Sequence, residues 1–469
     1  MSQMRRDLEK LGAELWPDTN ELRPGRATAG ASQRKPRRHH LGLEPLVTAT
    51  TAVLLIAALA AAVALGRGTS PHAANPVPPK PIAPVASVTA AQLARGHWSQ
   101  LPAAPIGGRI GASVVWTGTE LLDWGGASVA QTVAYADGAA YNPRTRRWRM
   151  LPAAPLSPRF EQASAWDGTE MLVWGGYDGH SHPTDGLADD GAAYDPTRNR
   201  WRALPAAPLS ARAGALAVWT GTTMTVLGGY ADGSGQRPPR DGAAYDPATD
   251  RWTPIPAPIP PGAHSLTWAS AVQAGGKLLA FSDWATSTSC GSGCFEGAGG
   301  TDVYAYDVRA NGWHLVPAAA GALSGADQVF WTGSVVIARG GQWCGGCLGP
   351  EQPLSSAAYD PARNTWTQLP ADPLNWSHPG SVWTGAALFS FNSETTALHS
   401  PGPPYASVTP GESTAYDPKA GWVQLPSAPS GCGSFEWLRP VWTGHEVLLT
   451  CPSNAAGSGA GGLALTPEH

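Results

Sequence analysis

Basic residues recur at one position of a repeated unit in this chain of 469 residues, at the connection from each unit to the next. The aligned positions hold Arg109, Arg159, Arg212, His264 and His378. Guanidinium and imidazolium groups gathered around one axis would bind a carboxylate or another anion. The alternative is structural, with each arginine head donating to nearby backbone carbonyl oxygens. We expect Asp137, Asp190 and Asp241, which precede the next strand, to pair with these arginines or to accept from loop amides.

The loop richest in polar side chains is "YDGHSHPTDGLADD" at residues 177–190. His180 and His182 lie close to Asp178, and imidazoles with carboxylates are zinc ligands. A His-x-His pair is also common in solvated loops, so we expect no metal here.

The repeat itself predicts the elements that position these residues. "VWTGTELLDWGG" at 115 and "AWDGTEMLVWGG" at 165 each predict a strand, a tight turn at a glycine and a second strand. "AYDPTRNRWRALP" at 193 predicts a third strand, an Asp-Pro turn and a fourth strand. Units of about 50 residues with four short strands predict the blades of a β-propeller. In such a blade the tight turns lie on one side. The second-to-third loops, which vary in length, lie on the other side with the blade connections, and we expect function there.

The two ends of the repeat region are complementary. The last unit contains predicted strands at 434–440, 441–450 and 461–467 but no fourth, whereas "GHWSQLPAAP" at 96 is a fourth strand without its first three. An open ring would expose unpaired strand edges. We therefore expect residues 97–101 to pair with 461–467 and to close blade seven.

These units resemble the kelch family, in which a Gly-Gly doublet is followed by a Tyr and a Trp about seven residues apart. Gly125–Gly126, Tyr141 and Trp148 show that pattern, and the resemblance covers residues 97–467. It implies an all-β fold, a seven-bladed kelch-type β-propeller of four-stranded antiparallel blades. Some kelch-type propellers are oxidases that bind copper through two Tyr and two His, and others are sialic-acid epimerases with a polar funnel. We find no complete copper ligand set and no evident acid/base pair, so we expect no cofactor. We expect the protein to bind a ligand rather than to catalyse a reaction.

One segment is unlike the rest of the chain. Residues 46–66 contain no charged residue, and this segment is long enough to span a bilayer as a transmembrane helix. The basic stretch "RKPRRHH" at 34–40 precedes it. The positive-inside rule predicts a cytoplasmic N-terminus and a propeller outside the cell. A cleaved signal peptide is the alternative. If the span is not cleaved, residues 1–45 are a cytoplasmic tail, with a short amphipathic helix before a disordered stretch. Residues 67–96 are a Pro-rich extracytoplasmic linker, and 97–469 are the propeller.

All six cysteines follow the predicted span: Cys290, Cys294, Cys344, Cys347, Cys432 and Cys451. An even number outside the cytoplasm predicts disulfides. The first four lie in the second-to-third loops of units four and five, where zinc binding by four thiolates is the alternative. We expect Cys432 to pair with Cys451, because the hairpin that turns at Thr443–Gly444 brings its ends together.

Charge excludes one class of partner. Beyond the tail the chain has 22 basic and 29 acidic residues, which does not favour nucleic acid. The sequence therefore predicts a membrane-anchored, extracytoplasmic binding module for an unidentified protein or glycan. The alternatives are a carbohydrate-active enzyme with its site in the central funnel, and a protein that passes a signal to the cytoplasmic tail.

Overall fold

The computed structural model separates residues 1–74 from a second compact unit, residues 75–469. The structure describes residues 86–128, 131–179, 186–231, 239, 241–256, 267–291, 294–308, 310–317, 323, 326, 328–340, 356–373, 380–391, 411–429, 439–451 and 461–468. All of the described elements belong to the second unit, which is a β-propeller.

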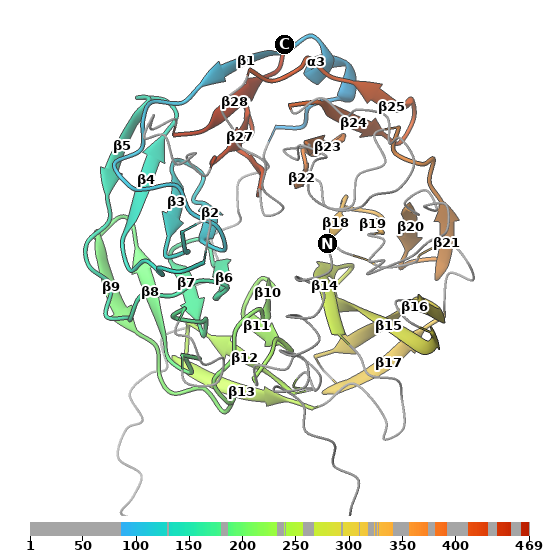
Figure 1. Cartoon of the computed structure of the whole chain (residues 1–469), viewed down its shortest axis with the longest axis horizontal. Helices are drawn as coiled ribbons and strands as arrows, with labels where there is room; N and C mark the ends of the chain where they lie inside the picture. Colours follow the sequence, from blue (N-terminus) through green and yellow to red (C-terminus); the bar gives the residue numbers. More distant parts are fainter. Residues whose placement is uncertain are drawn as a thin grey trace, which may run out of the picture. The chain divides into compact units, whose positions relative to one another are not determined.

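Seven four-stranded antiparallel sheets form the blades, as the repeat predicts (Figure 1). Blades one to three contain β2 (Ser113–Trp116), β3 (Leu121–Trp124), β4 (Gly138–Asn142) and β5 (Arg147–Met150); β6 (Ala163–Trp166), β7 (Met171–Trp174), β8 (Gly191–Asp195) and β9 (Arg200–Ala203); and β10 (Leu216–Trp219), β11 (Met224–Leu227), β12 (Gly242–Asp246) and β13 (Arg251–Ile255). Blades four to six contain β14 (Thr267–Ala274), β15 (Lys277–Gly291), β16 (Cys294–Asp307) and β17 (Gly312–Val316); β18 (Gln328–Trp331), β19 (Val336–Arg339), β20 (Ser356–Asp360) and β21 (Thr365–Gln368); and β22 (Gly380–Trp383), β23 (Leu388–Phe391), β24 (Ser413–Asp417) and β25 (Gly421–Gln424). Blade seven contains β26 (Val441–Trp442), β27 (Val447–Leu449), β28 (Leu463–Thr466) and β1 (His97–Gln100).

The inner strands follow one another around a closed ring. Each first strand neighbours the first strand of the next blade, and β26 of blade seven neighbours β2 of blade one. Apolar side chains fill the space between neighbouring sheets. Leu122 and Trp124 of blade one, for example, pack with Met171, Val173 and Tyr194 of blade two. Because both faces of each sheet are covered in this way, every residue of the second strands β3, β7 and β11 is buried.

The tryptophan of the repeated phrase ties each blade to the one before it. Its indole Nε1 donates to the carbonyl oxygen of the proline that follows the outer strand of the preceding blade, over 2.8 to 3.0 Å. The seven bonds join Trp148 to Pro102, Trp201 to Pro152, Trp252 to Pro205, Trp313 to Pro256, Trp366 to Pro317, Trp422 to Pro370 and Trp98 to Pro426. The last of these belongs to the closing strand, so the series of bonds returns to its start.

The predicted closure of blade seven is confirmed. β1 pairs antiparallel with β28, from His97 opposite Thr466 to Gln100 opposite Leu463. The inner strand of this blade is Val441–Trp442 and not residues 434–440 as expected from sequence. The reason is the turn: Thr443 and Gly444 follow Trp442 directly, as Thr117 and Gly118 follow Trp116 in blade one, and Gly444 adopts a φ of 94°.

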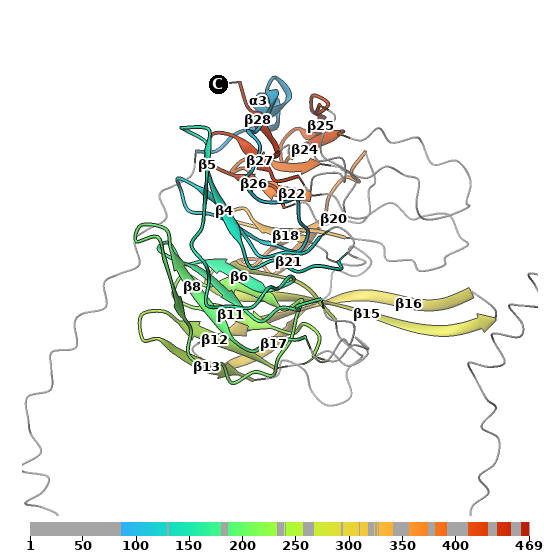
Figure 2. The same ribbon diagram turned by 60° about the vertical axis from the view of Figure 1, so that its left-hand side comes forward.

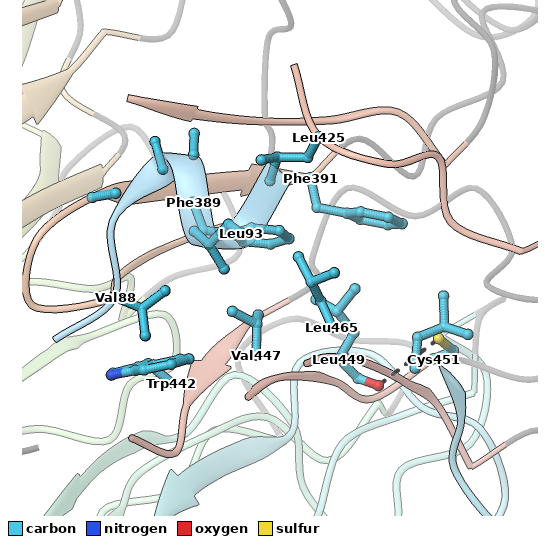
Figure 3. Close-up of a cluster of buried hydrophobic side chains, with 14 residues drawn as sticks. Val88, Leu93, Phe389, Phe391, Leu425, Trp442, Val447, Leu449, Cys451 and Leu465 are labelled. Atoms are coloured by element: carbon cyan, nitrogen blue, oxygen red, sulfur yellow. Dashed lines mark hydrogen bonds between the residues drawn. The ribbon is translucent and has the colours of Figure 1, made fainter. Parts of the chain in front are cut away.

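Residues 86–96, the end of the predicted linker, pack against the propeller. Helix α3 (Ala90–Ala94) begins at the N-cap Thr89 and contacts β24 and β25 of blade six. Leu93 of this helix is completely buried in a cluster with Phe389 of blade six and Leu449 and Leu465 of blade seven (Figure 3). We call residues 86–96 the strap, since this segment covers the seam between blades six and seven.

Blade four departs from the expected short strands. Residues 290 and 294, expected in a loop, lie in β15 and β16, which continue past the other blades as a long hairpin (Figure 2). Cys344 and Cys347 lie outside the described residues. Cys451 is buried and disulfide-bonded, and its Sγ lies 4.0 Å from the carbonyl oxygen of Leu449 (Figure 3). Its expected partner Cys432 lies outside the described residues, so that pairing stays a prediction.

Within the described part of the chain, none of the helices has the length and apolar character that crossing a bilayer requires. The span predicted at residues 46–66 and the tail at 1–45 lie outside that part.

Closure by β1 makes a testable difference between two deletions. Removing residues 97–102 deletes β1 and the Trp98 indole that binds Pro426, so we expect aggregation or loss of a cooperative thermal transition. Removing an equal length within residues 72–84 should leave the Tm unchanged. Equal behaviour of the two deletions in differential scanning calorimetry would contradict the closure.

Candidate functional site

The two sides of the propeller differ. On the turn side lie the tight turns within each blade, such as Thr117–Glu120 and the turn from Asn142 to Arg147. On the loop side lie the second-to-third loops and the connections between blades. The residues expected to form a ligand site are at the connections, so the loop side is the place to look for it.

Arg159 and Arg212 are buried and use their donors within the protein. The Nη1 atom of Arg159 donates to Asp190 Oδ1 over 2.7 Å and to the Gly175 carbonyl over 3.1 Å. Its Nε and Nη2 atoms donate to the carbonyl and hydroxyl oxygens of Ser157. Arg212 repeats the arrangement with Asp241, Gly228 and Ser210.

Arg109 differs in one atom. Its Nη1 donates to Asp137 Oδ1 over 2.9 Å and to the Gly125 carbonyl over 2.8 Å. Its Nη2 is buried without a hydrogen-bond partner among the described residues. The expected pairing of the arginines with Asp137, Asp190 and Asp241 is therefore present in all three blades.

The backbone of the same arginines joins neighbouring blades. Arg159 donates its N–H to the Tyr135 carbonyl of blade one and accepts from the Gly126 N–H of that blade. These contacts fix the blade connection and the second-to-third loop together. They account for the arginines structurally, and their contact with an anion stays a prediction. His264 and His378 lie outside the described residues, so the structure brings together three of the five expected ring members.

Asp178 of the polar loop donates its backbone N–H to the Gly186 carbonyl. His180 and His182 lie outside the described residues.

Glu161 was not expected from sequence to be functional, yet it occupies an unusual backbone position. Its φ is 54°, in the left-handed region, and the equivalent residues of blades one and three are Gly111 and Gly214, each with a φ of 63°. Glu161 donates its N–H to the Gly111 carbonyl and accepts from the Gly214 N–H, both over 2.9 Å. These bonds connect three blades where the inner strands begin. A side chain in the left-handed region costs about 1–2 kcal/mol relative to glycine.

The Glu161 carboxylate is held by a tyrosine from the next blade. The hydroxyl of Tyr230, which follows β11 in blade three, donates to Glu161 Oε2 over 2.5 Å. Burial, and next the negative charge of Glu161, raise the pKa of Tyr230. The hydroxyl therefore keeps its proton at neutral pH and stays a donor to the carboxylate.

Arg439 approaches the same carboxylate from blade seven. It precedes the inner strand β26, and its surface is exposed to solvent. Surrounding protein nevertheless lowers the pKa of its guanidinium by desolvation, which the charge of Glu161 opposes. Arg439 is therefore exposed to solvent and yet surrounded by protein, as expected of a side chain near the propeller axis. The charge of Glu161 acts on Arg439 although blade one separates the two blades that carry them.

We call Glu161, Tyr230 and Arg439 the axial site. A carboxylate with one oxygen engaged by a tyrosine, together with an exposed guanidinium, provides acceptors and donors for a ligand with several hydroxyl groups. The signal that could have revealed Glu161 was present in the repeat, because the position reads Gly, Glu, Gly in blades one to three.

A second unexpected carboxyl lies between blades. Asp123 of β3 shares a strand face with Leu121, which packs against Leu448 and Ala464 of blade seven. Burial raises the pKa of Asp123 to about 6, although Arg109 acts to lower it. Its Oδ1 has no hydrogen-bond partner among the described residues.

Comparison with known proteins agrees with this architecture. The family model of the KLHDC2/KLHL20/DRC7 Kelch-repeats domain matches residues 84–282, which include the strap and blades one to three. Blades four to six repeat the same Tyr–Trp pairs and Trp-to-Pro bonds, and blade seven repeats the bond through Trp98 and Pro426. The family match and the seven-bladed architecture together support a kelch-repeat β-propeller family. A solved structure described as "Structure of YjhT" is 15% identical, with a TM-score of 0.44 over 58% of this chain and 88% of that one. No curated protein matches.

The kelch Gly-Gly doublet has a steric role in this structure. Gly125 and Gly175 adopt φ values of 73° and 70°. A Cβ at Gly125 would lie 2.9 Å from the Arg159 carbonyl oxygen, and one at Gly175 would lie 2.7 Å from that of Arg212. The doublet therefore allows the backbone of the arginine in the next kelch unit to approach.

Asp123 gives the kelch ring a measurable pH dependence. Its folded pKa is above the usual value of 3.8, so ionisation disfavours the folded state, and stability falls as pH rises from about 4 to 6. The pKa difference corresponds to about 3 kcal/mol. We expect Asp123→Asn to match the parent near pH 4 and to exceed its unfolding free energy by about that amount above pH 7. Urea denaturation at several pH values measures this, and a pH-independent difference would show that Asp123 does not titrate in this way.

Proposed function

We propose that this kelch propeller is a membrane-anchored, extracytoplasmic binding module that takes a glycan at the axial site on its loop side. The observation behind the proposal is Glu161, which stands in a left-handed position that the neighbouring repeats give to glycine. Stability alone favours glycine there. A carboxylate retained at such a cost, bonded to a tyrosine of the next blade and electrostatically coupled to Arg439, suits a binding site.

The chemistry of the three residues favours hydroxyl-rich ligands over an apolar peptide surface. A carboxylate accepts from two hydroxyl groups of a sugar ring, a guanidinium donates to two, and Tyr177, which lies near Tyr230, adds an aromatic ring. Protein ligands of the loop side are the other partner class that the kelch fold accommodates.

Location outside the cytoplasm has two supports. The apolar segment 46–66 follows the basic stretch 34–40, which places the propeller beyond the membrane by the positive-inside rule. Cys451 is disulfide-bonded, and disulfides persist in oxidising compartments.

A carbohydrate-active enzyme is the second candidate, and the Glu161–Tyr230 pair is the observation that favours it. A carboxylate that holds a tyrosine hydroxyl at 2.5 Å resembles a general base beside a general acid. If the protein is an enzyme, the glycan that binds should be converted, and Glu161→Gln should abolish conversion while the glycan still binds measurably.

Substitution of Glu161 separates binding from folding. Glu161→Gly restores the residue of the neighbouring repeats, so we expect its unfolding free energy to stay within about 1 kcal/mol of the parent. Glycan binding should weaken about 10- to 100-fold, since a charged hydrogen bond contributes about 1.5–3 kcal/mol. A glycan array probed with residues 75–469, which contain all seven blades and the closing strand, would identify the ligand, and titration calorimetry would measure the loss.

Glu468→Gln is the matched control. It removes one carboxylate from an exposed pair with Arg95 on the strap and should leave glycan binding unchanged. Full glycan binding by Glu161→Gly would place the ligand elsewhere on the propeller.

Topology has an independent test. A reporter that works only in the cytoplasm, fused after His469, should be inactive, whereas the same reporter fused before residue 34 should be active. Activity of the C-terminal fusion would contradict the proposed orientation.

A further inference from the structure

The described chain enters the propeller on the turn side. Val88 donates its N–H to the Thr384 carbonyl over 3.1 Å and accepts from the Thr384 hydroxyl over 2.8 Å. Thr384 begins the tight turn between β22 and β23. The Ala86 carbonyl accepts from the Trp442 indole, directly before the Thr443–Gly444 turn of blade seven. Whatever precedes residue 86 is therefore joined to the turn side.

Blades one and two present arginines on that same side. The turn from β4 to β5 holds four arginines and no acidic residue within 142–149, and the turn from β8 to β9 holds three arginines and one aspartate within 195–202. The exposed members, which we call the turn arginines, are Arg144, Arg146, Arg147, Arg198 and Arg200.

Part of this positive charge is neutralised within the propeller, because Arg149 pairs with Glu120 and Arg202 pairs with Glu170, both in the first turns of the same blades. Arg198 pairs with Asp195 over 2.6 Å. Arg144, Arg147 and Arg200 form no ion pair with any carboxylate in the described part of the chain. By contrast, the equivalent turn of blade five pairs Arg363 with Asp360. The net positive charge of these turns is therefore concentrated on blade one, because Asp167, Glu170 and Asp195 balance the three arginines of blade two. Blade two adds the exposed Arg200 beside it, which has no ion-pair partner among the described residues.

Arg146 departs from the repeat, and its Nη2 donates to the Gln100 carbonyl of the closing strand β1 over 2.9 Å. Its φ is 52°, and the equivalent residues Asn199, Asp250, Asn311 and Asn364 share this left-handed conformation. Asn and Asp tolerate it well. In those four blades the residue also accepts from the tyrosine hydroxyl of its own blade, as Asn199 does from Tyr194 over 2.7 Å. Arginine has no acceptor to offer Tyr141, so blade one loses this bond and gains an exposed cation.

We propose that the turn arginines dock the propeller on the anionic headgroups of a phospholipid bilayer. The proposal rests on the proposed membrane anchor for the choice of surface, because a tether that joins the turn side keeps that side near the membrane. A flat array of separate guanidinium groups on exposed turns matches a surface of phosphates. Each basic residue near such a surface strengthens attachment about fivefold.

Vesicle binding tests the proposal directly. Residues 75–469 are mixed with vesicles of equimolar phosphatidylglycerol and phosphatidylcholine, or of phosphatidylcholine alone, and the bound fraction is measured by sedimentation. We expect binding to the anionic vesicles at low salt, loss of binding at high salt, and none to phosphatidylcholine. Arg147→Glu with Arg200→Glu should weaken the binding by at least about 25-fold.

The matched control reverses two charges on the same side of other blades. Arg363→Glu with Lys419→Glu changes the net charge equally and should have a much smaller effect on vesicle binding. Equal losses in the two double variants, or equal binding to both kinds of vesicle, would overturn the proposal. Binding to heparin or DNA without binding to anionic vesicles would assign the arginines to another polyanion and overturn it as well.

Arg146→Asn supplies a second measurement. It restores the acceptor for Tyr141 but removes the bond from Arg146 to the Gln100 carbonyl, so we expect a small change in Tm while vesicle binding falls about fivefold. Unchanged vesicle binding by this variant would count against the proposal. Glycan binding should survive all of these changes, so failure of lipid docking and failure of the glycan site remain distinguishable.

Discussion

The hydrogen bond from a tryptophan indole to the proline carbonyl of the preceding blade is the interaction on which the rest of this propeller depends. It occurs seven times and returns to its start through Trp98 and Pro426. Each blade exposes two apolar faces, and only a closed ring covers all of them. Since the closing strand β1 and the strap come from the N-terminal end of the domain, residues far apart in sequence determine whether the ring forms at all.

A closed ring with regular spacing also explains which polar residues are structural. Arg159 and Arg212 occupy equivalent positions and make equivalent bonds to an aspartate, a glycine carbonyl and a serine. A residue that recurs in several blades with the same hydrogen-bond partners has a structural role in the repeat. Buried guanidinium groups of this kind need full hydrogen bonding to offset desolvation, and they obtain it within their own blade.

Residues that depart from the repeat require a different explanation. Glu161 and Arg146 both occupy left-handed positions for which other blades use glycine, asparagine or aspartate, and each places a charged side chain where the repeat has none or a different one. Asp123 replaces the apolar residue found at the equivalent position in blades two and three, Val173 and Val226. The first two lie on opposite sides of the propeller, so the proposed glycan site and the proposed lipid contact are on different sides.

The sequence by itself determined the blade, the number of blades and the closure, because these depend on local periodicity and on turn residues with fixed backbone requirements. It also predicted the Arg–Asp pairs, since both partners recur within one unit. It could not predict the axial site, whose members come from blades two, three and seven and meet only when the ring is complete. The sequence predicted the inner strand of blade seven at "SFEWLRP", residues 434–440, because this stretch has the composition of a strand. In the structure the turn at Thr443 sets the register, and the inner strand is Val441–Trp442. Tertiary structure alone decided that Glu161 accepts from Tyr230 and that its charge acts on Arg439, because contacts between blades depend on ring closure and not on any one repeat.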